Sequence, residues 1–167
     1  QNSKKKHYYR ILSEFMLQQT QVKTVIPYFL NFVRKIPNLG TLSTSNEKKV
    51  LKLWEGLGYY RRAKNLHKSS KIIVKKYNSK IPKNFSQLKD LPGIGDYTAN
   101  VLLALVHNQS RIGLDGNVKR VLFRLFNTNN INVINLFETK RNDDLAEALI
   151  EFGALICRPM DPKCYEC

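Results

Sequence analysis

Apolar residues recur every three or four positions along most of the chain, which is the spacing of amphipathic helices rather than the alternation of strands. Polar, glycine and proline residues separate these stretches, as at Gly40, and Ser45 is the expected N-cap of the third helix. A polar stretch at 127–135 is expected to be a loop. The pattern predicts an all-α fold with helices near 11–17, 25–33, 47–54, 62–77, 86–89, 97–106, 117–125 and 145–156.

Positive charge is concentrated in the first half of the sequence. The 167 residues hold 28 Lys and Arg against 13 Asp and Glu, and residues 1–80 alone contain 18 basic and 3 acidic side chains. A one-sided excess fits a polyanionic partner, because each phosphate contact releases counterions. The alternatives are a solvated basic surface or one that faces a membrane. The longest apolar run, 101–106, is too short to span a bilayer, so we expect a soluble, intracellular protein.

All three cysteines, Cys157, Cys164 and Cys167, lie within the last 11 residues. An odd, clustered set predicts metal ligation rather than a disulfide framework. Three thiolates are one short of the four that zinc or an iron–sulfur cluster usually takes, so we expect a fourth ligand beyond the end of this chain. A zinc knuckle and free thiols remain open.

The string Leu91-Pro92-Gly93-Ile94-Gly95 stands between two amphipathic stretches, directly before a helix. Glycine allows the positive φ and the close backbone approach that a tight turn needs. Free N–H groups at the turn and at the helix start then form a site for a DNA phosphate. This helix-hairpin-helix would position a duplex without reading its sequence. A purely structural turn is the alternative.

Through these motifs, the chain resembles the helix-hairpin-helix glycosylases of the endonuclease III superfamily, and more narrowly adenine DNA glycosylases of the MutY type. The stretches 13–22 and 53–60 are typical of the adenine enzymes, whereas the hairpin is common to the superfamily. The matching strings cover most of the chain: 13–22, 25–29, 53–60, 63–67, 91–99, 114–122 and 152–157.

The resemblance implies a two-lobed fold. A six-helix barrel lobe with the hairpin would span 8–110, and residues 1–7 with 111–167 would form a partial iron–sulfur cluster lobe. The partner would be double-stranded DNA with the target adenine flipped out, because the glycosidic bond is inaccessible inside the base stack. We expect a monomer, which would work in the cytoplasm with the nucleoid if bacterial, or in the nucleus or mitochondrion if eukaryotic.

Two carboxylates are the expected centre of the reaction. Glu14 alone would be a helix-surface glutamate, but it lies among apolar residues, and burial favours a protonated carboxyl that can donate a proton. The resemblance assigns it protonation of the adenine ring. Asp115 precedes a helix and is a candidate N-cap. The resemblance places the catalytic aspartate here, where a fixed carboxylate would stabilise an oxocarbenium-like sugar.

Tyr97 distinguishes hydrolysis from lyase chemistry. Bifunctional endonuclease III-type members carry a lysine in this slot, immediately before Thr98-Ala99, and that lysine forms a Schiff base. Tyrosine cannot form an imine with the sugar. The resemblance therefore implies a monofunctional hydrolase that releases adenine mispaired with 8-oxoguanine or guanine. Asn117 would position water or the sugar.

Further residues are expected to contact DNA. By the resemblance, Gln18, Gln19 and Tyr59 contact or wedge into the helix around the flipped base, since amides read base edges and a ring replaces lost stacking. The hairpin residues Leu91, Gly93 and Gly95 would approach a phosphate. Tyr60 is expected to pack in the core. The basic run from Arg61 to Lys76 winds around a helix, so only some of it can face DNA.

The resemblance also implies a 4Fe-4S cluster on the three cysteines, with recognition of 8-oxoguanine placed in a further C-terminal domain. Three alternatives remain. A thymine mismatch glycosylase also carries tyrosine before Thr-Ala in some cases, but Glu14 disfavours it. An endonuclease III-type enzyme is disfavoured by Tyr97, and a non-catalytic DNA-binding module by the set Glu14, Tyr97, Asp115 and Asn117.

Overall fold

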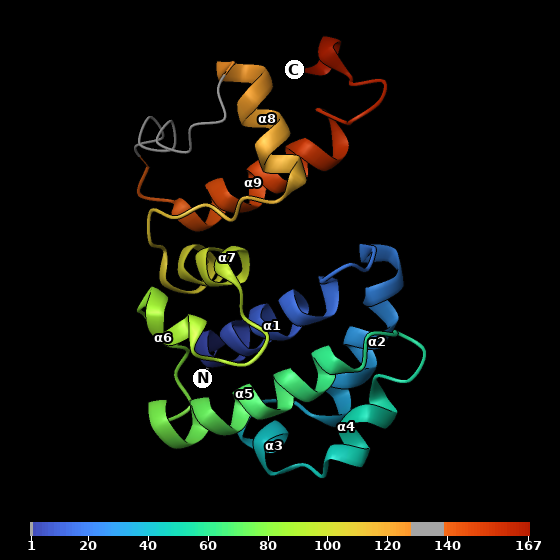
Figure 1. Cartoon of the computed structure of the whole chain (residues 1–167), viewed down its shortest axis with the longest axis vertical. Coiled ribbons are helices and arrows are strands. Elements are labelled where there is room, and N and C mark those ends of the chain that lie inside the picture. Colours follow the sequence, from blue (N-terminus) through green and yellow to red (C-terminus); the bar gives the residue numbers. More distant parts are fainter. Residues whose placement is uncertain (1, 128–138) are drawn as a thin grey trace. The chain divides into compact units, whose positions relative to one another are not determined.

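The computed structural model describes residues 2–127 and 139–167, which form helices and no strand. From residue 128 on, the predicted loop at 127–135 lies outside the described residues. The helices are coloured along the chain in Figure 1. They are α1 Asn2–Leu17, α2 Val22–Lys35, α3 Leu39–Thr44, α4 Glu47–Leu53, α5 Arg61–Tyr77, α6 Phe85–Lys89, α7 Asp96–His107, α8 Gly116–Phe126, α9 Asn142–Leu155 and the 3-10 turn η2 Cys164–Glu166.

The predicted helices are all present, and one more was missed. The region around Gly40 was interpreted as a break, but α3 forms there because the Asn38 side chain accepts a hydrogen bond from the Thr41 N–H at 2.8 Å and caps the helix. The predicted N-cap of the next helix was wrong by one residue. Asn46 caps α4, while Ser45 ends α3.

Contacts divide the chain into two compact units: an N-terminal unit, Gln1–Gly95, and a C-terminal unit, Asp96–Cys167. This division falls at the hairpin and groups α7 with the C-terminal helices. The lobes expected from the family resemblance, 8–110 and 1–7 with 111–167, stay a prediction.

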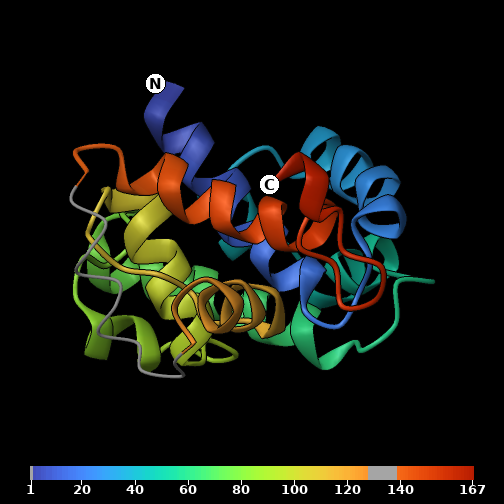
Figure 2. The same cartoon turned by 90° about the horizontal axis from the view of Figure 1, so that it is seen from above.

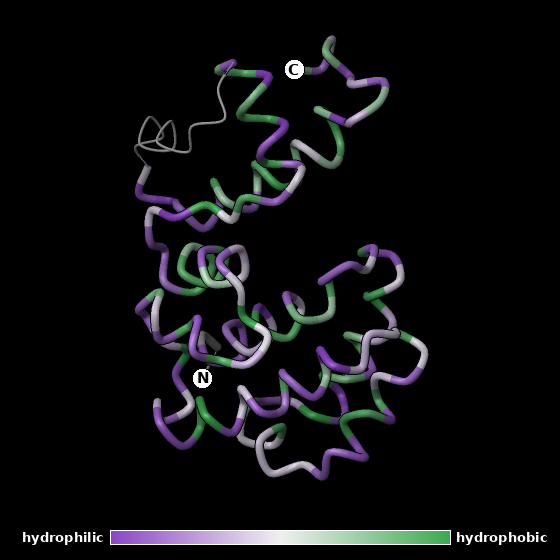
Figure 3. The backbone as a smooth tube through the Cα atoms, in the orientation of Figure 1, coloured by the Kyte–Doolittle hydropathy of each residue, from purple (hydrophilic) through white to green (hydrophobic). Residues whose placement is uncertain are grey.

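In the N-terminal unit, α1 packs against α2 and α5, and α5 also contacts α3 and α4. Hydrophobic and hydrophilic residues alternate along each of these helices, as the colours of Figure 3 show. Their apolar stripes meet in a core whose largest fully buried side chains include Trp54, Tyr8, Phe15 and Phe32. Because the last turn of α1 belongs to this core, the residues that follow it start from a fixed point.

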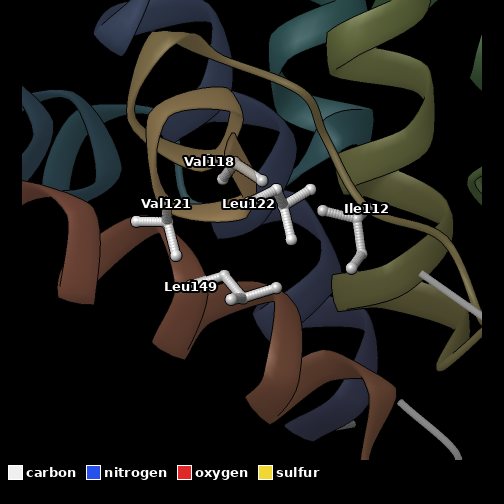
Figure 4. Close-up of a cluster of buried hydrophobic side chains, with 5 residues drawn as sticks. All are labelled: Ile112, Val118, Val121, Leu122 and Leu149. Atoms are coloured by element: carbon white, nitrogen blue, oxygen red, sulfur yellow. The ribbon is translucent and has the colours of Figure 1, made fainter. Parts of the chain in front are cut away.

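In the C-terminal unit, α9 contacts both α7 and α8. Figure 2 shows α8 (gold) beside α9 (red). One buried cluster joins the segment before α8 to both helices, with Ile112, Val118, Val121, Leu122 and Leu149 side by side in Figure 4. A second cluster, Val101, Ala104, Leu105 and Ala146, joins α7 to α9. These clusters fix the start of α8, where Asp115 lies.

Across the described ranges, no helix has both the length and the apolar content that crossing a membrane requires.

Candidate functional site

The end of α1 carries three of the predicted site residues. Glu14 is half-buried beside the fully buried Phe15 and Met16. Gln18 follows the helix, and its side-chain amide donates to the Gly93 carbonyl at 3.2 Å. Gln19 is exposed and has a left-handed backbone, with φ of 56°. The fold thus connects the Gln18 turn directly to the hairpin.

A second turn, residues 56–60, presents Tyr59. Gly56 and Gly58 have φ of 94° and 78°, a backbone conformation that glycine adopts without steric cost. Tyr59 is 62% exposed and also left-handed, with φ of 48°. The prediction that Tyr60 packs in the core was wrong. It is 43% exposed, because it directly precedes α5 and its hydroxyl accepts from the Gly56 N–H at 3.4 Å.

A non-glycine residue in the left-handed region costs about 1–3 kcal/mol, and such residues persist only where the surrounding structure holds them. Gln19 and Tyr59 are both of this kind, and both were predicted from the resemblance to contact DNA. Each of the two strained turns therefore needs support from the surrounding structure.

Arg62 provides hydrogen bonds to both turns, and sequence reasoning missed it. Its guanidinium is buried and donates to the carbonyl of Met16 in the last turn of α1, to that of Gln18 just after the helix, and to that of Gly58 at 3.2 Å. Burial lowers the pKa of Arg62. The available signal was its spacing: Arg62 lies four residues before the buried Leu66, on the inward stripe of α5.

The hairpin at 91–95 uses its two glycines differently. Gly93 has φ of 83°, and a Cβ there would lie 2.8 Å from the Phe15 ring and 2.9 Å from the Asn65 Cβ. Gly95 has open space around the same position. Leu91 is buried, so its side chain anchors the turn and a DNA contact would fall to its backbone. Contacts within the protein therefore exclude a side chain at position 93 but not at position 95.

Asp115 is the N-cap of α8, as predicted. Its backbone is extended and one carboxylate oxygen accepts from the Val118 N–H at 2.7 Å. The other oxygen accepts from the Asn117 side-chain amide at 3.4 Å. Asp115 and Asn117 are both half-buried. A carboxylate held at a helix N-terminus lies in a favourable field, and the two hydrogen bonds fix its position.

Tyr97 lies in the first turn of α7 and reaches the segment before Asp115. Gly113 is buried against it, because a Cβ at Gly113 would lie 2.9 Å from the Tyr97 ring and 2.1 Å from the Val101 side chain. The absence of a side chain at Gly113 allows this close packing. The structure therefore gathers Tyr97, Asp115 and Asn117 in the C-terminal unit.

Arg120 connects the start of α8 to the end of α9. Its guanidinium donates to the Asn117 side-chain oxygen at 2.9 Å and to the carbonyls of Gly153 at 2.7 Å and Cys157 at 2.8 Å. Gly153 makes this approach possible, since a Cβ there would lie 2.7 Å from the Asn117 Cβ. Asn117 is thereby oriented by Arg120, which also bonds to α9, as well as by Asp115.

The three cysteines occupy different environments. Cys157 packs against the buried cluster of α8 and α9, and its sulfur accepts from Arg124 at 3.5 Å, whereas Cys164 and Cys167 are exposed. Thiols are the donors that iron–sulfur clusters take, so the donor chemistry fits. Within residues 2–127 and 139–167, however, no three His, Cys, Asp or Glu side chains are gathered closely enough to hold a metal ion.

Comparison with known proteins decides the family. The family model of the HhH-GPD superfamily of base excision DNA repair proteins matches residues 12–142. The chain belongs to this superfamily. The adenine DNA glycosylase of Buchnera aphidicola subsp. Baizongia pistaciae is 43% identical over 177 residues, which cover 98% of this chain and 50% of that protein. The chain thus spans about half the length of the curated relatives it matches.

Solved structures of two other DNA-acting proteins share the fold. A thermostable thymine-DNA glycosylase matches with a TM-score of 0.78 at 25% identity, over 98% of this chain and 81% of that one. A trapped endonuclease III–DNA covalent intermediate matches with a TM-score of 0.81 at 21% identity, over 95% and 78%. The predicted all-α helix-hairpin-helix glycosylase fold and the family resemblance are confirmed. The roles of the individual site residues stay predictions.

Proposed function

We propose that the protein containing this chain is a monofunctional adenine DNA glycosylase, which hydrolyses the N-glycosyl bond of adenine mispaired with 8-oxoguanine or guanine. The observation that carries the proposal is the fixed carboxylate of Asp115 at the start of α8, oriented by Val118 and Asn117. The 43% identity to a curated adenine DNA glycosylase supports adenine as the substrate.

In the proposed reaction, Glu14 donates a proton to the ring of the flipped adenine, so that the base can leave as a neutral molecule. Departure of the base leaves positive charge on the sugar. The Asp115 carboxylate stabilises this charge without reorganising, because its hydrogen bonds already hold it in place. Asn117, held by Arg120, orients the water or the sugar.

Tyr97 limits the reaction to hydrolysis. Its phenol offers no amine for a Schiff base with the sugar, so residue 97 forms no covalent adduct and strong lyase activity is not expected. The close packing of Gly113 on the Tyr97 ring supports a role in shaping the site near Asp115.

For the cofactor, we propose that Cys157, Cys164 and Cys167 supply three thiolates to a 4Fe-4S cluster. A cluster bound there would add its ligation energy to folding of the C-terminal unit. The whole protein should contain about four iron and four sulfide ions and absorb visible light, and Cys157→Ser should lower both. A fully folded whole protein free of iron would contradict this assignment.

As partners, we propose double-stranded DNA with a flipped adenine and a monomeric enzyme that works where the genome lies: the bacterial cytoplasm with the nucleoid, or a eukaryotic nucleus or mitochondrion. The basic residues concentrated in 1–80 support DNA as the partner.

The decisive experiment is single-turnover base release by the whole protein from duplexes with A:8-oxoguanine, A:G and T:G pairs. We expect release of adenine from the first two duplexes without strong strand cutting. Release of thymine without adenine would establish the thymine alternative, which the 25% identical thymine-DNA glycosylase keeps open. Binding of the duplexes without release of either base would show that the protein is a non-catalytic DNA-binding module.

A further inference from the structure

Arg62 links the two strained turns of the N-terminal unit, the one at Gln18–Gln19 and the one at 56–60. Toward α1 it donates to the carbonyls of Phe15 at 3.3 Å and Met16 at 2.6 Å, and to that of Gln18. Toward the 56–60 turn it donates to the carbonyl of Leu57 at 3.4 Å and of Gly58 at 3.2 Å. One side chain therefore serves carbonyl groups on both sides.

The aromatic environment of Arg62 completes the support. Its guanidinium lies 5.4 Å from the centre of the Tyr59 ring and 5.5 Å from that of Trp54. The Trp54 indole N–H donates to the Gly58 carbonyl at 3.1 Å, so the same turn is held a second time. The planar guanidinium can stack on rings and serve several carbonyls at once, which a lysine ammonium cannot do.

The partners of Arg62 also explain why a charged group is placed here. The carbonyls at the end of α1 carry the negative end of the helix dipole, which favours a cation. Among the described residues, the hydrogen-bond acceptors of Arg62 are all backbone oxygens, so its contacts fix main-chain positions rather than another side chain. Backbone position is what the left-handed residues Gln19 and Tyr59 depend on.

We propose that Arg62 is a positioning residue that holds the Gln18–Gln19 turn and the Gly58–Tyr59 turn together as one rigid edge for opening the base stack. The inference rests on the proposed function for its readout in DNA. It assigns Arg62 no contact with the nucleic acid. Loss of the planar guanidinium should make both turns more mobile at once, although they are about 40 positions apart in the sequence.

The test compares Arg62→Lys and Arg62→Met with Arg34→Met in the whole protein. Arg34 is an exposed arginine of the same unit that bonds only locally to Asn31 among the contacts described, so the control removes the same charge. The first readout is hydrogen exchange. We expect at least tenfold faster amide exchange at residues 18–20 and 57–60 in Arg62→Lys, with the rest of α1 and α5 unchanged and no change in Arg34→Met.

The second readout is base-stack opening, followed by the fluorescence of 2-aminopurine placed beside the target adenine. Arg62→Lys should lower the rate constants of stack opening and of adenine release at least tenfold, and leave binding to undamaged duplex within twofold. Arg62→Met should be more severe, and Arg34→Met should match the parent protein in stack opening and adenine release.

The outcomes separate the two proposals. If the parent protein releases no adenine, the proposed function fails, whereas hydrogen exchange and stack opening still judge Arg62. If Arg62→Lys keeps parental exchange in both turns, or if exchange rises uniformly through the N-terminal unit, the positioning role is overturned. Faster exchange in only one turn also overturns it, because the proposal requires both turns to be released together.

Discussion

At the start of α8, the single carboxylate of Asp115 both caps the helix and is proposed to stabilise charge on the sugar. The two roles respond differently to substitution. Asparagine caps a helix about as well as aspartate, while alanine does not. Asp115 therefore offers a direct separation of structural and catalytic contributions at one position.

We expect Asp115→Asn to leave the free energy of unfolding almost unchanged and to lower the single-turnover rate constant by roughly 10²–10³-fold, since the cap oxygen stays and the charge is lost. Asp115→Ala should lose the same activity and also about 0.5–2 kcal/mol of stability. Denaturant unfolding and base-release assays measure the two effects. Turnover by Asp115→Asn at the parental rate would show that the carboxylate is only a cap.

The two glycines of the hairpin give a second contrast between residues. Gly93→Ala should destabilise the protein by about 1–3 kcal/mol, because the new Cβ meets Phe15 and Asn65 and φ is positive. Gly95→Ala meets nothing within the chain, so stability should not fall. If a phosphate approaches Gly95, this variant should weaken duplex binding by about 1 kcal/mol, roughly fivefold in Kd. Unchanged binding by Gly95→Ala would argue against close approach of a phosphate there.

At the scale of helices, α9 begins with a cap supplied from outside the helix. Its own N-cap residue, Arg141, makes no side-chain cap bond. Instead the Asn108 side-chain oxygen, just after α7, accepts from the N–H groups of Asn142 at 2.7 Å and Asp143 at 3.2 Å. Asn108 is itself left-handed, with φ of 51°, a conformation that asparagine tolerates. This one residue ends one helix and starts another.

Replacing Asn108 should therefore separate conformation from capping. Asn108→Gly keeps the left-handed backbone but loses the cap, and should cost about 0.5–2 kcal/mol. Asn108→Ala loses both and should cost about 1–2 kcal/mol more. Thermal or denaturant unfolding followed by circular dichroism measures the difference. Equal stability of the glycine variant and the parent would mean that solvent caps α9 equally well.

For the whole molecule, the uneven charge predicts how DNA binding depends on salt. A protein that neutralises about six phosphates loses roughly 10³-fold in affinity between 50 and 200 mM salt, and each contact contributes about 0.9 to the logarithmic slope. With 18 basic residues in 1–80 and a balanced remainder, the contacts should be concentrated in the first half. The basic residues of 1–80 would then govern the encounter with undamaged DNA.

Titrations of undamaged duplex by fluorescence anisotropy should show this asymmetry. Pairs of Lys→Gln variants in residues 61–76 should reduce the salt slope by about one per phosphate contact removed, whereas Lys163→Gln should leave it unchanged. Equal effects from both regions would show that the DNA contacts are not concentrated in the basic half.

Much of the local structure could be predicted from the sequence. Apolar spacing located the helices, the Asp115 cap followed from its place before a polar helix start, and Gly56, Gly58 and Gly93 have the positive φ that their turns suggested. Each of these features depends on interactions within a few residues. The helix α3 was missed because its cap, Asn38, is also typical of turns. Its buried residues Leu39 and Leu42 belong to a helix that packs against α5, which is distant in the sequence.

The sequence by itself determined the family, the helices and the residue types of the proposed reaction. The tertiary structure decided which groups meet. In the sequence, Arg62 is one more cation in a basic run. In the structure, it donates to the carbonyls of Met16 and Gly58. Likewise, the sequence does not distinguish Gly113 and Gly153 from other glycines. In the structure, Tyr97 packs against Gly113 and Asn117 packs against Gly153. The reason is physical: caps and turns are set by neighbours along the chain, whereas the burial of a charge or the closeness of two helices depends on how distant segments pack.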